Sequence, residues 1–173
     1  MLKLLIVEDD SQLATTLKYL VEDNPRYRVM AIAADADGAI AAAAEHRPDL
    51  ALLDLQLAHG TSGFSVAVHL GELDVPCLFV TGKPPGFPMP DLAMGCLMKP
   101  FTAEEVHRSI GLAEDRLRGR EALRQRLPTN FTIYEEPSAP ALAFAEAGPM
   151  PGYIPSKRSL LTRLEHWISG HAA

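Results

Sequence analysis

Short apolar runs that alternate with helix-like segments most constrain how this chain can fold. Runs of strand length occur at residues 3–7, 28–33, 50–54 and 77–81. Segments with helical character separate them at residues 13–21, 38–46 and 64–73. This order of elements forms right-handed βαβ units, so we expect an α/β protein whose parallel sheet has helices on both faces. Sites in such sheets lie at the carboxyl ends of the strands.

The alternation breaks after the fourth strand. Residues 82–90 contain four prolines where the next helix would be due, and proline prevents a regular helix. We therefore predict that this fourth helix is shortened or absent. Residues 96–98 can form a short fifth strand, and Thr102 with Glu105 forms a capping box. The box starts a long fifth helix that is predicted to extend to about Arg126.

The chain divides into three regions. Residues 1–120 form the α/β domain, residues 127–155 a proline-rich linker or arm, and residues 156–169 an amphipathic C-terminal helix. Residues 131–134 have strand character and could extend a sheet edge in the same chain or in a partner. The C-terminal helix is expected to bury its apolar face on its own domain, on a second copy as a homodimer, or on a target. The contact residues on that face are Leu160, Leu164 and Trp167.

The composition argues against several classes of protein. The 173 residues carry a formal net charge of -6, so nucleic acid is not expected as a partner. The apolar runs have strand length rather than bilayer length, and the N-terminus lacks the apolar stretch of a signal peptide. We therefore expect a cytoplasmic protein that does not bind membranes. Cys77 and Cys96 lack the spacing of metal ligands and are expected to be free, buried thiols.

Three carboxylates follow strands that are expected to be neighbours in the sheet. Glu8 and Asp9 follow the first strand, and Asp54 ends the third. Clustered like charges raise one another's pKa unless a cation neutralises them, and Mg²⁺ prefers carboxylate, carbonyl and water ligands. The three side chains therefore predict a divalent metal site. For the acidic run alone, stabilisation of a helix N-terminus is an equally good explanation, and the added Asp54 favours the metal site.

A hydroxyl and an ammonium group are expected at the same edge of the sheet, because Thr81 ends the fourth strand and Lys99 follows the fifth. Phosphoryl transfer needs positive charge and hydrogen-bond donors on the transferred oxygens, and a nucleophile opposite the leaving group. In this interpretation Asp54 is the nucleophile, Lys99 balances charge, and Thr81 binds a new phosphoryl oxygen. Taken singly, Thr81 is an ordinary strand residue and Lys99 a solvated side chain, so the argument depends on their joint placement.

Four motifs in this order resemble the receiver domain of bacterial two-component response regulators. They are LIVEDD at the first strand, LLDLQL at the third, FVTG at the fourth and MKPF at the fifth. The resemblance covers roughly residues 1–120. It implies a flavodoxin-like, doubly wound sheet of five parallel strands in the order 2-1-3-4-5. It also implies a cis peptide bond between Lys99 and Pro100, which suits the low cost of cis bonds before proline.

The resemblance further implies a role for each residue of the site. Asp54 would carry the phosphoryl group as an acyl phosphate. Mg²⁺ would be bound by Asp9, Asp54 and the main-chain carbonyl of Gln56, with Glu8 acting through water. The phosphoryl donor would be a sensor histidine kinase or a histidine phosphotransfer protein, and the output would be contact with a downstream protein target. Because the tail offers one convincing helix and few basic residues, no DNA-binding output domain is expected.

Two departures from the family pattern concern how phosphorylation would be passed on to the protein target. Cys96 stands three positions before Lys99, where typical receivers carry an aromatic switch residue, so the usual coupling of Thr81 to a swinging ring is missing. The second departure is the proline-rich segment after the fourth strand. The FVTG sequence that ends this strand partly matches a receiver subclass that has a Phe-Ala-Thr-Gly motif and a mobile or missing fourth helix. Val80 stands where that motif has alanine. We predict that phosphorylation orders the loop over residues 82–95 rather than turning a ring.

The sequence leaves two other functions open. A receiver without its switch aromatic could act as a phosphorylation-independent adaptor, although the complete set of pocket residues favours phosphorylation. A small phosphate-ester hydrolase would use the same nucleophile, but such enzymes commonly need a second aspartate where Gln56 stands. We expect a signalling module that catalyses only its own phosphorylation and dephosphorylation, and not an enzyme with an independent substrate.

Overall fold

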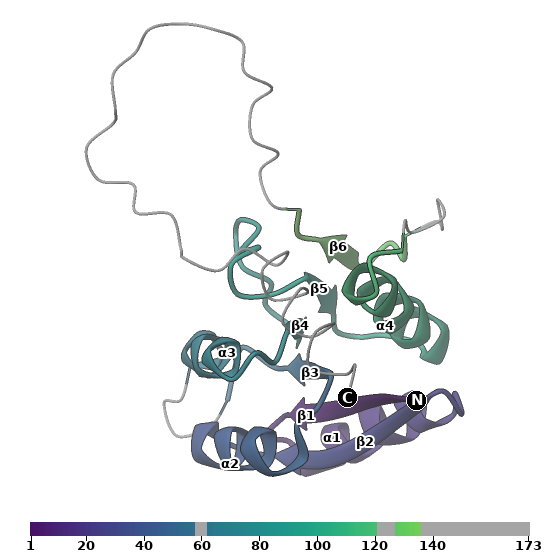
Figure 1. Cartoon of the computed structure of the whole chain (residues 1–173). Coiled ribbons are helices and arrows are strands. Elements are labelled where there is room, and N and C mark those ends of the chain that lie inside the picture. Colours follow the sequence, from purple (N-terminus) through teal and green to yellow (C-terminus); the bar gives the residue numbers. More distant parts are fainter. Residues whose placement is uncertain (58–61, 121–126, 136–173) are drawn as a thin grey trace, which may run out of the picture.

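The computed structural model describes residues 1–57, 62–120 and 127–135 (Figure 1). The strands in these ranges are β1 (Leu2–Val7), β2 (Tyr27–Ala33), β3 (Leu50–Leu53), β4 (Cys77–Thr81), β5 (Gly95–Met98) and β6 (Phe131–Ile133). The helices are α1 (Ser11–Glu22), α2 (Ala36–His46), α3 (Gly63–Glu72) and α4 (Ala103–Leu117). The predicted C-terminal helix over residues 156–169, with its contact residues Leu160, Leu164 and Trp167, lies outside the described residues.

The strands form one sheet in the order β2-β1-β3-β4-β5-β6. The first five pair in parallel in the order 2-1-3-4-5, as the resemblance implies, and β6 pairs with β5 in the antiparallel direction. The prediction of a purely parallel, five-stranded sheet is therefore wrong at one edge. Without β6, the backbone N–H and C=O groups on the outer side of β5 would lack partners, and residues 131–134 cover them.

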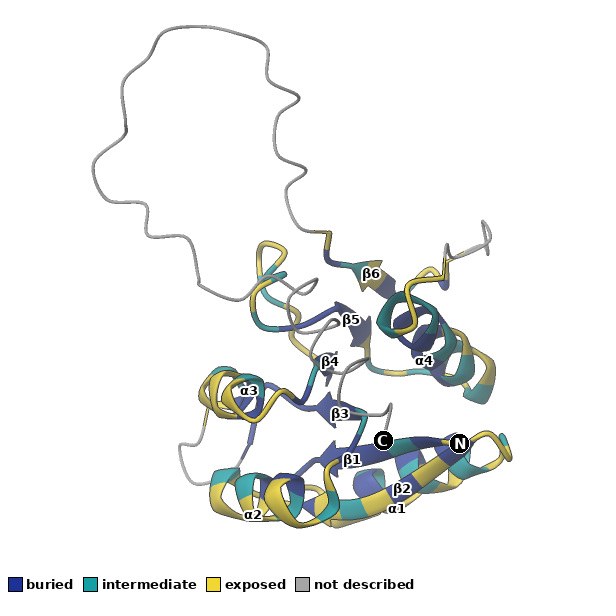
Figure 2. Ribbon diagram, in the orientation of Figure 1, coloured by how far each residue is buried: buried dark blue, intermediate teal, exposed yellow. Residues whose placement is uncertain are grey.

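Helices cover both faces of the sheet, as the alternation of elements predicts. On one face, α1 and α4 pack over a core cluster that includes Leu17 and Ile110. On the other face, α2 and α3 pack over a cluster that includes Ala43 and Leu70. Figure 2 shows the inner strands β1, β3 and β4 in dark blue, whereas the edge strand β2 and the exposed sides of α2 and α3 carry yellow. Both β3 and β4 are buried along their whole length, which explains why their sequences are continuously apolar.

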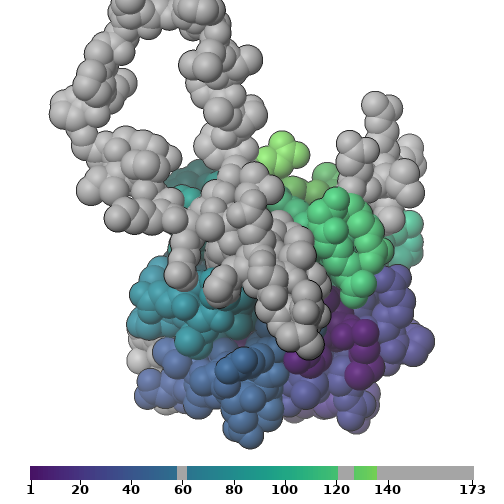
Figure 3. All heavy atoms as spheres, in the orientation of Figure 1, coloured from purple at the N-terminus to yellow at the C-terminus, as the bar shows by residue number. Residues whose placement is uncertain are grey.

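The helix α4 lies against the N-terminal part of the chain. Its His107 side chain places Nε2 2.5 Å from the carbonyl oxygen of Leu20 in α1. Arg26, just before β2, places Nη2 2.7 Å from Oε2 of Glu114, a carboxylate whose side chain is only 3% exposed. In the space-filling view, the green surface of α4 meets the purple surface of the N-terminal residues (Figure 3). These contacts hold the last helix of the domain on its first βα unit.

No helix joins β4 to β5 within residues 82–94, all of which the structure describes. This agrees with the effect expected of the prolines. The end of the segment is nevertheless fixed, because Ala93 and Met94 are buried and the N–H of Met94 donates to the carbonyl of Cys77 at 2.8 Å. The helix that the sequence places fifth is consequently the fourth in the structure, α4.

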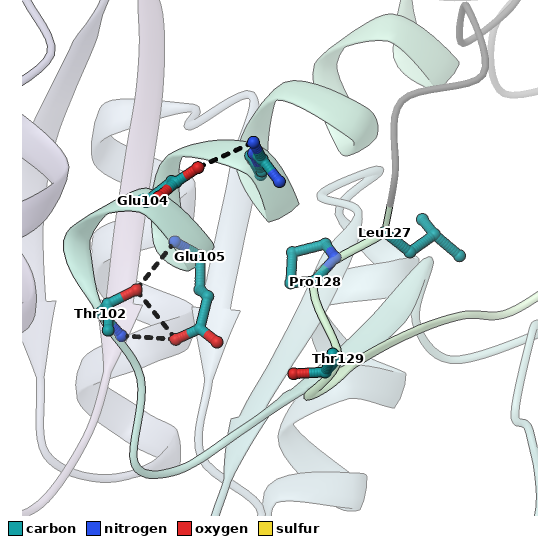
Figure 4. A pocket seen from close by; sticks show the side chains of 7 residues that line it. Thr102, Glu104, Glu105, Leu127, Pro128 and Thr129 are labelled. Atoms are coloured by element: carbon teal, nitrogen blue, oxygen red, sulfur yellow. Dashed lines mark hydrogen bonds and ion pairs between the residues drawn. The ribbon is translucent and has the colours of Figure 1, made fainter.

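The start of α4 is the predicted capping box. Thr102 Oγ1 accepts the N–H of Glu105 at 3.3 Å, and the Glu105 carboxylate accepts the N–H of Thr102 at 2.7 Å (Figure 4). A surface hollow of about 300 Å³ lies beside the box, and none of the predicted site residues contributes to it. Its lining residues are Thr102, Glu104, Glu105, Arg108, Leu127, Pro128 and Thr129.

The end of α4 comes earlier than predicted. Gly119 has a φ of 61°, in the left-handed region that glycine adopts without strain. The N–H of Arg120 donates to the carbonyl of Asp115 at 2.8 Å, and this backbone bond closes a Schellman motif. The helix therefore ends at Leu117 and does not continue towards Arg126. Residues 121–126 lie outside the described part of the chain.

Residues 127–135 fold onto the sheet, although the sequence assigns them to the start of a linker. The strand character of residues 131–134 predicted that they could extend a sheet edge, and they do so in the same chain. Gly95 allows β6 to approach closely, because a Cβ at this position would lie 2.5 Å from the carbonyl oxygen of Thr132. Phe131 and Tyr134 are 6% and 3% exposed and belong to core clusters on opposite faces of the sheet. The strand is therefore part of the domain, and the linker predicted from residue 127 does not begin before residue 136.

Candidate functional site

The two buried acidic residues of the site are fixed by backbone bonds between neighbouring strands. The N–H of Glu8, just after β1, donates to the carbonyl of Ala33, and the N–H of Asp54, just after β3, donates to the carbonyl of Val7, both at 2.9 Å. Glu8 is 3% exposed and Asp54 is 6% exposed. The strand order therefore brings both carboxylates to one edge of the sheet, where the sequence places them.

Asp9 completes the predicted acidic cluster. One carboxylate oxygen from each of Glu8, Asp9 and Asp54 lies within 4.8 Å of the other two. Asp9 is the most exposed of the three, so the cluster opens to solvent on its side. Next to it, Gln56 is exposed and its backbone N–H donates to Oδ1 of Asp54 at 3.0 Å. All four of the predicted metal-binding residues therefore lie together.

Lys99 lies between the two buried carboxylates. Its Nζ is 2.6 Å from Oε2 of Glu8 and 2.6 Å from Oδ2 of Asp54. The backbone N–H of Lys99 donates to the carbonyl of Thr81 at 2.9 Å, and the Lys99–Pro100 peptide bond is cis, the form that the resemblance implies. The ammonium group is thus the cation that balances the buried acidic pair in this structure.

The electrostatics of the site follow from this arrangement. Burial raises the pKa of Glu8, the charge of Asp54 acts in the same direction, and the bond to Lys99 reduces the effect without reversing it. Burial lowers the pKa of Lys99, but its bonds to Asp54 and Glu8 outweigh burial, so the net direction is upward. One positive charge therefore neutralises the acidic residues only in part, and a second cation would be stabilised there.

The donor set fits Mg²⁺. Hard oxygen ligands suit this ion, and it is usually bound by one or two carboxylates while it keeps several waters. Glu8, Asp9 and Asp54 supply carboxylate oxygens close to one another, and the opening at Asp9 leaves room for water. The residues that would hold the ion are these three together with Gln56, through its main-chain carbonyl.

Thr81 is completely buried at the end of β4, beside the strand that leads to Lys99. Its hydroxyl oxygen accepts the backbone N–H of Lys83 at 3.3 Å, which is a long bond. The hydroxyl hydrogen takes no part in this bond, so Thr81 is able to donate a hydrogen bond to another acceptor. The structure therefore brings all three predicted catalytic residues, Asp54, Thr81 and Lys99, to the same edge of the sheet.

Gly63 has a role that the sequence alone did not assign. It is the first residue of α3, and a Cβ at this position would lie 2.2 Å from the carbonyl oxygen of Asp54 and 2.6 Å from Cα of Leu55. Its N–H donates to the carbonyl of Leu55 at 3.2 Å. Only glycine lets α3 start this close to the backbone of Asp54, so the residue shapes the loop that carries the nucleophile.

A second residue missed from the sequence is Tyr134, next to the predicted switch position Cys96. Cys96 is buried in β5, and the Tyr134 hydroxyl faces its thiol. Burial raises the pKa of both groups, and the contact with Cys96 raises the pKa of Tyr134 further. The strand pattern of residues 131–134 gave the only sequence signal, and it did not reveal which strand they would join.

Comparison with known proteins places this chain in a family. Over 116 residues the chain is 35% identical to the phyllosphere-induced regulator PhyR of Methylorubrum extorquens, covering 64% of this chain and 43% of that protein. Over 118 residues it is 33% identical to protein-glutamate methylesterase/protein-glutamine glutaminase 2 of Anaeromyxobacter dehalogenans, covering 65% of this chain and 35% of that protein. The chain therefore spans less than half the length of these two curated relatives.

A solved structure shows the same similarity. The receiver domain of a modulated diguanylate cyclase from Desulfovibrio desulfuricans G20 is 30% identical, with a TM-score of 0.59, and the match covers 67% of this chain and 95% of that one. Among the described residues, no helix is long and apolar enough to cross a membrane. The response regulator receiver domain model matches residues 4–111. The chain therefore belongs to the response regulator receiver domain family.

Proposed function

We propose that this chain is a response regulator that accepts a phosphoryl group on Asp54 from a phosphohistidine partner. The observation that carries the proposal is the position of Asp54. Its Oδ2 lies 2.6 Å from Nζ of Lys99, and its carboxylate belongs to the same cluster as Glu8 and Asp9. A carboxylate nucleophile with a cation beside it and further oxygen ligands around it meets the needs of phosphoryl transfer.

The reaction forms one bond and breaks one. A carboxylate oxygen of Asp54 attacks the phosphorus atom, a P–O bond forms, and the P–N bond to histidine breaks. The electron pair of that bond leaves with the ring nitrogen. Bound Mg²⁺ would neutralise part of the charge on the phosphoryl oxygens. In this mechanism Lys99 exchanges its contact with Oδ2 of Asp54 for a phosphoryl oxygen, and the Thr81 hydroxyl donates to another.

The donor and the output of this reaction are also part of the proposal. The donor is a sensor histidine kinase or a histidine phosphotransfer protein, and the output is contact with a protein target in the cytoplasm. Attack of water on the acyl phosphate restores Asp54 and releases phosphate, so the chain acts only on itself. The FVTG sequence, together with the lack of a helix within residues 82–94, supports the Phe-Ala-Thr-Gly subclass.

The test is the intact mass of the protein after incubation with acetyl phosphate and Mg²⁺. We expect a single phosphoryl adduct in the wild type and none in Asp54→Asn. Asp37→Asn is the matched control, because Asp37 is an exposed residue of α2 and its loss should leave the adduct unchanged. If the wild type forms no adduct even with a competent histidine kinase, the phosphorylation-independent adaptor becomes the better interpretation.

A further inference from the structure

The strand β6 pairs with residues 95–97 of β5, the strand that leads to the site lysine. The register pairs Gly95 with Ile133, Cys96 with Thr132, and Leu97 with Phe131. β5 therefore lies between β4, which ends at Thr81, and β6, which has no part in the chemistry proposed for the site. A shift of β5 that accompanies a change at the site has to be accommodated by β6.

One end of β6 is attached to both neighbours of Lys99. The carbonyl of Asn130 accepts the N–H of Met98 at 2.8 Å. The Asn130 side-chain amide donates to the carbonyl of Met98 at 3.0 Å and to that of Pro100 at 3.2 Å. A displacement of the Lys99 backbone would therefore strain these three hydrogen bonds.

The other end of β6 is fixed by Tyr134. Its N–H donates to the carbonyl of Met94 at 2.9 Å, and its own carbonyl accepts a hydrogen bond from the guanidinium of Arg116 in α4. The ring is buried with its hydroxyl at the Cys96 thiol, and its centroid lies 6.3 Å from that of Phe79 in an edge-to-face arrangement of 72°. The backbone, ring and hydroxyl of Tyr134 thus each have a separate partner.

Phe79 extends this contact towards the phosphorylation site. Its ring also packs edge-to-face on Phe64 of α3, with centroids 5.8 Å apart at 89°. Phe64 directly follows Gly63, whose backbone approaches that of Asp54, and Phe79 lies two positions before Thr81 on β4. A row of three rings therefore runs from the loop of Asp54, across β4, to β6.

A change at Asp54 would act on this row of three rings through both β4 and β5. Phosphorylation moves the negative charge that Lys99 now contacts at 2.6 Å from the carboxylate to the phosphoryl oxygens, and it gives the buried Thr81 hydroxyl a new acceptor. Thr81 shares β4 with Phe79, and Lys99 follows the strand that carries Cys96. Of the two strands that contact Tyr134, β4 therefore ends in a residue that gains an acceptor. The other, β5, is followed by a lysine that exchanges one of its two carboxylate partners.

We propose that Tyr134 is the residue that senses the state of Asp54 in this chain: its hydroxyl at Cys96 couples β5 to β6, and phosphorylation changes how firmly β6 is held. This inference rests on the proposed phosphorylation of Asp54. It places the sensing aromatic ring directly after the sixth strand, against the thiol of Cys96, the residue of the fifth strand that stands where typical receivers carry an aromatic side chain.

The first test is hydrogen–deuterium exchange of the full chain, read by mass spectrometry, with and without beryllofluoride and Mg²⁺ as a phosphoryl mimic. We expect amide exchange in a peptide covering residues 127–135 to change by about threefold or more. A peptide covering β2 serves as the control, because β2 forms the opposite edge of the same sheet. If β6 responds no more than β2, the inference is wrong.

The second test uses two tyrosine variants that each remove one buried hydroxyl. Tyr134→Phe keeps the ring on Phe79 and loses the contact with Cys96, whereas Tyr27→Phe makes the same change in the core cluster on the other face. We expect Tyr134→Phe to lose most of the exchange response of β6 and to shift the affinity for beryllofluoride, because coupling between two sites is reciprocal. A full response in Tyr134→Phe, equal to that in Tyr27→Phe, would overturn the role of the hydroxyl.

Intact mass separates this inference from the function on which it rests. If acetyl phosphate or a kinase gives no adduct on wild-type Asp54, the proposed function fails, and the sensing role fails with it. If the adduct forms at wild-type level and β6 exchange does not change, only the sensing role fails.

Discussion

Glu8 and Lys99 are 91 positions apart in the sequence, yet Nζ of the lysine lies 2.6 Å from Oε2 of the glutamate. Neither side chain is exposed by more than 17%. Such a pair stabilises a fold only while both partners are present, because removal of one leaves a buried charge without compensation. Lys99 has a second carboxylate partner in Asp54, so its loss would affect two buried acids together.

Lys99→Met should therefore lower the free energy of unfolding by about 3 kcal/mol at neutral pH. Urea denaturation followed by circular dichroism would measure this change. Lys83→Met is the control, because Lys83 is exposed and its side chain should contribute little. Equal urea midpoints for Lys99→Met and the wild type would show that the ion pairs do not stabilise the fold.

Mg²⁺ should raise the melting temperature of the wild type in a concentration-dependent way, because a ligand that binds only the folded state stabilises it by mass action. Asp9→Asn should remove most of this effect, and Asp37→Asn should retain it. Chelation with EDTA should return the wild type to its metal-free melting temperature. The same rise in Asp9→Asn as in the wild type would exclude Asp9 as a ligand.

Gly63→Ala should destabilise the protein by about 2 kcal/mol and slow phosphorylation of Asp54, because its Cβ would lie 2.2 Å from the carbonyl oxygen of that residue. Gly86→Ala makes the same change where no atom lies within 4 Å, and it should be nearly neutral. Adduct formation over time and urea denaturation would measure the two effects. A Gly63→Ala protein with wild-type kinetics of phosphorylation would show that the loop carrying Asp54 can move away from the added Cβ without loss of function.

Gly95→Ala should displace β6, since the added Cβ would lie 2.5 Å from the carbonyl oxygen of Thr132. We expect amide exchange across residues 131–134 to rise about tenfold or more while β1 and β3 keep their protection. Gly86→Ala again provides the matched control. Unchanged exchange in Gly95→Ala would mean that β6 can shift outward without losing its pairing.

The decrease in the free energy of unfolding at alkaline pH should depend on Tyr134. Burial raises the pKa of its hydroxyl above the ordinary value, so the folded chain favours the neutral form. The resulting stabilisation is complete below about pH 10, the value for an unfolded tyrosine, and is lost as pH rises towards the folded pKa. Tyr134→Phe should lose less stability than the wild type above that pH, as measured by urea denaturation in a pH series.

The control for this series is Tyr19→Phe, because Tyr19 is 73% exposed and its hydroxyl reaches solvent in the folded chain. It should follow the wild-type pH dependence. If Tyr134→Phe follows the wild type as closely as Tyr19→Phe does, the burial of the Tyr134 hydroxyl has no effect on alkaline stability.

The position of the site could be predicted from the sequence because parallel strands constrain it strongly. Once residues 3–7 and 50–54 are taken as neighbouring strands, Glu8 and Asp54 must reach the same edge of the sheet. The contacts of Lys99 with both carboxylates follow less directly, since they also depend on how β5 ends. The prolines after Thr81 were equally informative, because their effect on a helix is local.

The sixth strand could not be placed from the sequence for a physical reason. Residues 131–134 alternate as a strand does, but three paired residues carry no local signal that selects β5 or a second chain as the partner. The roles of Gly63 and Tyr134 were not predicted for the same reason, since they depend on tertiary neighbours. The end of α4 is different, because Gly119 is a local stop signal in the sequence and the helix was nevertheless expected to extend to about Arg126.

The two edges of the sheet differ in how readily they could pair with a strand of a second protein molecule. At β2 the pairing with β1 shifts register between Leu4 and Leu5, an irregularity that makes a poor template for an added strand. At the opposite margin β6 itself occupies the place of such a strand. A fragment ending at residue 120 would expose the backbone of β5, and we expect it to aggregate where the longer chain stays dispersed.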